Sequence, residues 1–131
     1  QKDKGQILNV ASIAGFMPGP LMATYYATKA YVVRLSEAIR EELKKEKSNV
    51  KISILCPGPV DTNFNNVADV EFSIKGLSSK YVAKYAVKKL EKNKFYIVPG
   101  FSIKCAKIGA KIAPTGLVSK ISYKMQKRKI K

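Results

Sequence analysis

Apolar positions in this chain follow two patterns, short continuous runs and longer periodic segments. The short runs lie at about 5–12, 50–56 and 94–98, and turn residues such as Pro57-Gly58 and Pro99-Gly100 follow them. Runs of this kind are typical of buried strands. Between them, at about 24–46 and 79–92, apolar residues recur every three or four positions, which predicts amphipathic helices. Strands that alternate with helices indicate a parallel sheet and therefore an α/β fold.

The apolar faces of the two helices predict which side chains enter the core. These faces consist of Val32, Leu35, Ile39 and Leu43 in the first helix and of Val82, Tyr85, Ala86 and Leu90 in the second. Ser78 or Ser79 is expected to cap the second helix, because a serine oxygen can accept a hydrogen bond from a backbone N–H of the first turn.

A serine and a Tyr-x-x-x-Lys sequence follow the first predicted strand. Ser12 ends that strand, and ligands of open α/β sheets bind outside the carboxyl ends of strands. Tyr25 and Lys29 are four residues apart near the start of a helix, so they share one helical face. A tyrosine hydroxyl keeps its proton up to about pH 10, and a nearby ammonium makes that proton easier to remove. By itself, Tyr-x-x-x-Lys is also common on solvated helices.

Three segments together resemble the short-chain dehydrogenase/reductase family. They are Asn9-Val10-Ala11-Ser12, Tyr25-x-x-x-Lys29 and Pro57-Gly58-Pro59-Val60-x-Thr62, in the order and spacing of that family. The resemblance covers about residues 1–100 and implies the C-terminal half of a doubly wound, Rossmann-type parallel sheet. It also implies an oxidoreductase that interconverts a ketone or aldehyde and an alcohol with NADP or NAD, of which NADP is favoured.

The resemblance assigns a role to each matching residue. It implies that Tyr25 is the catalytic acid/base, that Ser12 donates a hydrogen bond to the substrate oxygen, and that Lys29 favours the tyrosinate and binds the nicotinamide ribose. It places the nicotinamide ring against the turn 57–62, with its carboxamide near the backbone of Val60 and the Thr62 hydroxyl. The residues expected to contact the cofactor are Tyr25, Lys29, Pro57, Gly58, Val60 and Thr62. The spacing from Ser12 and to Lys29 selects Tyr25 over its neighbour Tyr26, and Asn9 is expected to be structural.

The first half of the family's fold has no counterpart in this sequence. That half contains the glycine-rich turn that binds the cofactor pyrophosphate and the residue that reads the ribose. We therefore expect the 131 residues to be a fragment of a longer protein, and expect them alone neither to bind a nicotinamide cofactor tightly nor to turn over. The family also implies a small-molecule substrate and a homo-oligomer for the longer protein.

Composition narrows the class of protein. Hydrophobic content of 46% and charged content of 26% fit a globular protein. The absence of histidine removes the commonest ligand of metal sites and the commonest base of catalytic triads, so no metal is predicted. Cys56 and Cys105 lack metal-type spacing and are expected to be reduced thiols, which favours a cytoplasmic location.

Two segments are expected to cover the substrate. The loop Pro18-Gly19-Pro20 follows the serine and would lie over the active site. The polar segment 61–77 corresponds to a covering region in the family. Its candidate apolar lid residues are Phe64, Val67, Val70, Phe72 and Ile74.

The positive charge is concentrated at the C-terminal end. The net charge is +16, and residues 101–131 contain nine basic residues and no acidic one. Leu117, Ile121 and Met125 share one helical face, so we interpret 101–131 as a basic amphipathic extension of the domain formed by 1–100. It could pack on that domain or on a dimer partner, or it could bind an anionic membrane surface. Nucleic acid is a weaker candidate. A non-enzymatic half-domain that binds a membrane through this tail is the alternative function.

Overall fold

The computed structural model describes residues 3–63 and 75–127. In chain order its elements are β1 (Gly5–Val10), the 3-10 helix η1 (Ile13–Phe16), α1 (Ala23–Lys45), β2 (Val50–Leu55), β3 (Val60–Asp61), β4 (Leu77–Ser78), α3 (Ser79–Leu90), β5 (Tyr96–Ile97), α4 (Phe101–Ile112) and α5 (Thr115–Lys127). All three predicted strands and both predicted helices are present, within a few residues of the expected bounds.

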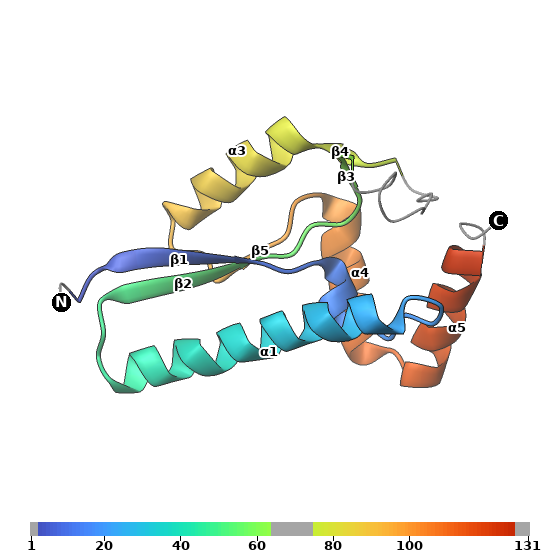
Figure 1. The fold of residues 1–131 in the computed structure, drawn as a ribbon, viewed down its shortest axis with the longest axis horizontal. Helices are drawn as coiled ribbons and strands as arrows, with labels where there is room; N and C mark the ends of the chain where they lie inside the picture. Colours follow the sequence, from blue (N-terminus) through green and yellow to red (C-terminus); the bar gives the residue numbers. More distant parts are fainter. Residues whose placement is uncertain (1–2, 64–74, 128–131) are drawn as a thin grey trace.

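The main sheet is parallel and has the order β1-β2-β5. A second, short parallel pair joins β3 and β4. Helix α1 covers one face of the main sheet and α3 the other, while α4 and α5 stand at the end where the strands have their carboxyl ends (Figure 1). The layers confirm the predicted α/β arrangement of a Rossmann-type half-sheet.

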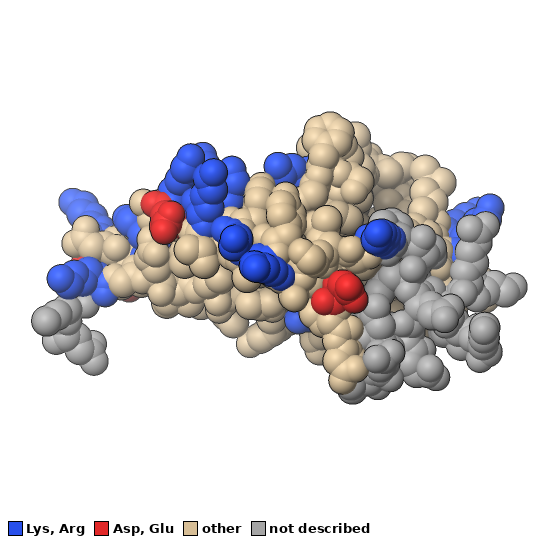
Figure 2. Space-filling model, turned by 90° about the horizontal axis from the view of Figure 1, so that it is seen from above, with Lys and Arg blue, Asp and Glu red and all other residues tan. Residues whose placement is uncertain are grey.

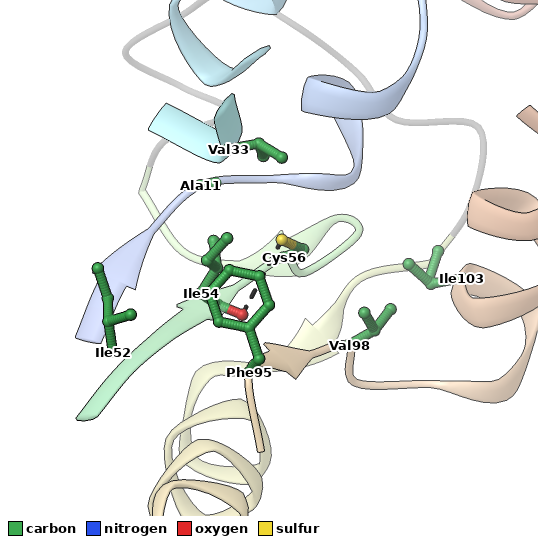
Figure 3. Packing of buried hydrophobic residues seen from close by; sticks show 8 residues of the cluster. All are labelled: Ala11, Val33, Ile52, Ile54, Cys56, Phe95, Val98 and Ile103. Atoms are coloured by element: carbon green, nitrogen blue, oxygen red, sulfur yellow. Dashed lines mark hydrogen bonds between the residues drawn. The ribbon is translucent and has the colours of Figure 1, made fainter. Parts of the chain in front are cut away.

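The core extends from the sheet into α4. Ile54 of β2 is fully buried beside Phe95, and Ile103 of α4 lies next to Val98 in the same cluster (Figure 3). Burying such side chains is the main favourable term in folding. Helix α4 is therefore integrated into the core by Ile103, although the sequence suggested an extension beginning at residue 101.

The predicted inner face of α3 is confirmed, and that of α1 is partly wrong. Val82 and Ala86 are buried, and Tyr85 and Leu90 pack against the same cluster. In α1, Leu35 is exposed and Ser36 is fully buried instead. The Ser36 hydroxyl donates to the Val32 carbonyl and accepts from the Asn9 amide, both at 2.7 Å, so its polar group is satisfied in the interior.

Local signals explain where α3 begins. The Ser78 Oγ accepts a hydrogen bond of 3.2 Å from the Tyr81 N–H, which confirms Ser78 as its N-cap.

Lysines of α3, including Lys80, Lys84 and Lys88, are exposed on the outer face of this helix. The side of the molecule that carries α3 shows groups of Lys and Arg side chains and few acidic ones (Figure 2). Within the described residues, no helix has both the length and the hydropathy needed to cross a membrane.

Candidate active site

A cavity of about 580 Å³ lies at the carboxyl ends of the strands. Its size falls in the range of small-molecule sites. Six of the seven predicted site residues line it: Ser12, Tyr25, Pro57, Gly58, Val60 and Thr62. The seventh, Lys29, does not line the cavity and lies behind Tyr25. The fold thus brings together residues from three separate segments of the sequence.

Ser12 is held at the end of β1 with its hydroxyl proton only weakly engaged. Its Oγ accepts a hydrogen bond from the Ala14 N–H at 3.1 Å and caps η1. It donates to the Pro57 carbonyl at 3.5 Å, which is long for a hydrogen bond between two oxygens. Because that contact is weak, a carbonyl oxygen in the cavity could replace it as acceptor.

Tyr25 and Lys29 project from neighbouring turns of α1. The Lys29 ammonium nitrogen lies 5.7 Å from the centre of the Tyr25 ring, within the range of a cation–π interaction. The same nitrogen donates to the Val10 carbonyl at 3.4 Å. The Lys29 ammonium group thus contacts both the end of β1 and the ring of Tyr25.

Tyr26 lines the same cavity but has different surroundings. Its hydroxyl accepts a 2.6 Å hydrogen bond from the Gln126 side-chain amide, and its ring centre lies 6.0 Å from that of Tyr25. Burial raises the pKa of Tyr26, and the hydrogen bond from Gln126 opposes this only in part. A raised pKa makes the Tyr26 hydroxyl a weaker acid than an ordinary tyrosine. The predicted covering loop packs here, since a Cβ on Gly19 would lie 2.1 Å from the Tyr26 ring.

The turn after β2 lines the cavity and is held in place on both sides. Its backbone is fixed by hydrogen bonds from the Ile13 N–H to the Pro57 carbonyl at 2.9 Å and from the Leu77 N–H to the Pro59 carbonyl at 3.0 Å. A Cβ on Gly58 would lie 2.4 Å from Ile103 Cδ1, so this turn packs closely on α4 and a larger residue would displace the Ile103 side chain. Pro57, Gly58, Val60 and Thr62 of this turn line the cavity, where the family resemblance places the nicotinamide end of the cofactor. The sequence has no glycine-rich turn to bind the phosphates.

Comparison with known proteins identifies the family. The sequence model described as short chain dehydrogenase matches residues 1–71, which is more than half of the chain. This chain belongs to the short-chain dehydrogenase family. The match includes the segments around Ser12, Tyr25 and Lys29 and the turn 57–62.

Relatives and a solved structure agree with this assignment. A CLA biosynthesis dehydrogenase/reductase of Lactiplantibacillus plantarum is 30% identical over 124 residues, which are 75% of this chain and 43% of the relative. A very-long-chain 3-oxoacyl-CoA reductase of Laccaria bicolor is 45% identical over 51 residues, which are 39% of this chain and 15% of the relative.

A short chain dehydrogenase from Burkholderia cenocepacia, solved in complex with NADP, superimposes with a TM-score of 0.72 at 24% identity. The superposition covers 87% of this chain and 46% of that protein. The likeness shows that the fold is a Rossmann-type α/β fold. This short-chain dehydrogenase chain spans less than half the length of each of these three proteins.

The sequence did not reveal the far wall of the cavity. This wall consists of side chains of α4 and α5, among them Ile103, Ala106, Gly109, Ala110, Ala113, Val118, Ile121, Ser122, Met125 and Gln126. Small residues at positions 106, 109, 110 and 113 recur at helical spacing, and this pattern was available in the sequence. Met17 and Met22 also line the cavity. The predicted lid residues within 64–74 lie outside the described residues.

Proposed function

We propose that the protein containing this chain is an NAD(P)-dependent oxidoreductase that interconverts a ketone or aldehyde and an alcohol. The observation that carries this proposal is the meeting of Ser12, Tyr25 and the turn 57–62 around one cavity at the carboxyl ends of the strands. Ser12 and Tyr25 lie there with polar groups directed at one mainly apolar space.

The reaction needs two transfers to the carbonyl group, a hydride to carbon and a proton to oxygen. A bound nicotinamide cofactor supplies the hydride. Ser12 holds the carbonyl oxygen by donating the hydrogen that is now shared weakly with Pro57. Tyr25 gives its hydroxyl proton to that oxygen and completes the alcohol. The Lys29 ammonium group, beside the Tyr25 ring, stabilises the tyrosinate through its positive charge. It also binds the nicotinamide ribose, as the resemblance to the family implies.

The cofactor, assembly and location belong to the same proposal. NADP is favoured over NAD, and the homo-oligomer that the family implies is retained for the full-length protein. A cytoplasmic location is supported by the two free cysteines, of which Cys56 is buried.

Isotope transfer tests the proposed reaction directly. NADPH or NADH deuterated at C4 of the nicotinamide is incubated with the full-length protein and a panel of apolar ketones and aldehydes. We expect deuterium at the carbinol carbon of the product, detected by mass spectrometry. Cofactor oxidation without deuterium in the alcohol, or no oxidation with any carbonyl compound, would contradict the proposal.

An exposed apolar stripe on α4 supports a second function, binding to an anionic membrane surface. Phe101 and Ile112 are 82% and 80% exposed, and Ile108 lies on the same helical face. Lys104 and Lys111 flank them, in a region of the sequence without acidic residues. Apolar side chains flanked by lysines are the features by which interfacial helices bind acidic lipids.

Vesicle sedimentation tests membrane binding. The protein should sediment with phosphatidylserine-containing vesicles but not with pure phosphatidylcholine vesicles. The double substitution Phe101→Asn and Ile112→Asn should abolish this, whereas Tyr31→Asn, at an exposed aromatic position of α1, should not. Equal sedimentation of both variants would rule out the α4 stripe as the contact.

A further inference from the structure

Helix α5 buries two polar side chains, although apolar residues of the same helix are partly exposed. Ser122 and Gln126 are 5% and 2% exposed, whereas Leu117, Ile121 and Met125 are exposed. An amphipathic helix normally buries its apolar stripe instead. Buried polar side chains need hydrogen-bond partners in the interior.

Gln126 is anchored at one end of its amide group and unsatisfied at the other. Its Nε2 donates to the Tyr26 hydroxyl at 2.6 Å. Its Oε1 is buried and has no hydrogen-bond partner among the described residues. Leaving a buried polar atom unpaired costs free energy, so such atoms are nearly always paired with protein, water or ligand.

The unsatisfied atom belongs to a residue that lines the candidate active site. Gln126, Tyr26 and Ser122 all border the cavity that also contains Ser12 and Tyr25. Most other residues around this cavity are apolar, so the Gln126 amide is a second polar point besides the reacting groups. Few, well-placed polar groups in an apolar pocket are what fixes the orientation of a small ligand.

We infer that Gln126, held by Tyr26, is a specificity-determining residue that binds a hydroxyl group of the substrate. If the amide were rotated by 180°, Oε1 would accept a hydrogen bond from the Tyr26 hydroxyl and Nε2 would be the unpaired atom. A hydroxyl can both donate and accept, so it satisfies either orientation. The substrate class is therefore a largely apolar carbonyl compound with a second, distant hydroxyl group. This inference rests on the proposed function, because it concerns the substrate of the same site.

Matched pairs of ketones test the inference. The full-length protein is assayed with 2-octanone, 2-decanone and 2-dodecanone and with their ω-hydroxy counterparts, so that several hydroxyl positions are sampled. We expect kcat/KM for the hydroxylated member to exceed that of its partner by about tenfold at one or more chain lengths, because the buried amide is left unpaired by the plain ketone. Gln126→Leu should bring this ratio close to one.

Two further variants separate substrate recognition from a structural role. Tyr26→Phe removes the anchor of the amide and should also reduce the ratio, with less change of shape than Gln126→Leu. Tyr123→Phe removes a hydroxyl from an exposed side chain of the same helix and should leave the ratio as in the wild type. A wild-type ratio near one at every chain length, or a ratio unchanged in Gln126→Leu, would overturn the inference and assign the amide to a buried water.

Thermal shifts distinguish failure of this inference from failure of the proposed function. A ligand that binds the folded protein raises its melting temperature whether or not it reacts. If no ketone is reduced but the ω-hydroxy ketones stabilise the wild type more than the plain ketones, and Gln126→Leu loses this difference, the hydroxyl site stands and the reductase proposal fails. If ketones are reduced and neither readout depends on the hydroxyl group, only the Gln126 inference fails.

Discussion

Tyr25 and Tyr26 are adjacent in the sequence but have different surroundings. Tyr25 has the Lys29 ammonium beside its ring, whereas the Tyr26 hydroxyl is bound to a neutral amide and its pKa is raised by burial. The four-residue step to lysine could be found in the sequence because it is local to one helix. The partner of Tyr26 could not, because Gln126 comes from a helix one hundred residues further along the chain.

The two cysteines differ in reactivity for the same kind of reason. Burial, together with the nearby Glu37 carboxylate, raises the pKa of the Cys56 thiol to about 12, and Lys107 opposes this only in part. Cys105 is exposed on α4. Because the thiolate is the nucleophile, iodoacetamide at about pH 8 should modify Cys105 and leave Cys56 intact in the folded protein.

Mass spectrometry of the alkylated protein checks this prediction. Cys105→Ser should remove all labelling under native conditions, and unfolding in guanidinium chloride should restore labelling at Cys56. Rapid native labelling of Cys56 would mean that the segment joining β2 to the site opens readily.

At the scale of elements, the contact between η1 and α1 determines where Ser12 and Tyr25 lie relative to each other. A Cβ on Gly15 would lie 2.8 Å from the Lys29 carbonyl oxygen and from Val33 Cγ2. Because the backbone at Lys29 is part of helix α1, it cannot move away from the added Cβ as a flexible side chain could. Gly15→Ala should therefore lower the free energy of unfolding by about 1–3 kcal/mol, the usual cost of overpacking.

Urea unfolding of Gly15→Ala measures this cost. Gly109→Ala is the matched control, because a Cβ there meets nothing within 4 Å and alanine is the better helix former. That variant should be neutral or more stable by about 0.5–1 kcal/mol. Equal destabilisation by both substitutions would mean that the close approach of η1 to α1 contributes little.

The elements themselves were predictable where local signals decide them. Helix α3 begins at its serine cap, and β1 and β2 are apolar runs between polar turns. The face of α1 that is buried was harder to predict from the sequence. The hydrogen bonds of Ser36 to Asn9 and Val32 allow a polar side chain inside, while Leu35 is exposed. The burial of Gln126 in α5 could not be predicted for the same reason, since it depends on a hydrogen bond to Tyr26, which is distant in sequence.

At the scale of the whole molecule, β1 forms an unpaired edge of the main sheet. Among the described residues it pairs only with β2, and its side chains Ile7 and Val10 are exposed. Exposed apolar edges pair with further strands or associate with other copies. The chain also covers less than half of the solved short-chain dehydrogenase, so most phosphate contacts of the cofactor would come from outside it.

This geometry predicts how the 131 residues behave alone. They should self-associate and should show no saturable NADPH binding at micromolar concentrations. Fluorescence titration with NADPH and analytical ultracentrifugation check the two expectations. Saturable micromolar binding by a monomer would show that the described cavity and turn hold the cofactor without further contacts.

The central claim, that Tyr25 transfers the proton in a carbonyl reduction, is tested most directly by the rate of hydride transfer in Tyr25→Phe. In the full-length protein at saturating cofactor, this substitution should lower the rate by about 10²- to 10⁴-fold while cofactor affinity stays nearly unchanged. Tyr26→Phe is the matched comparison on the same helix and should retain most of the rate of hydride transfer to a plain ketone. Full activity of Tyr25→Phe would contradict the account.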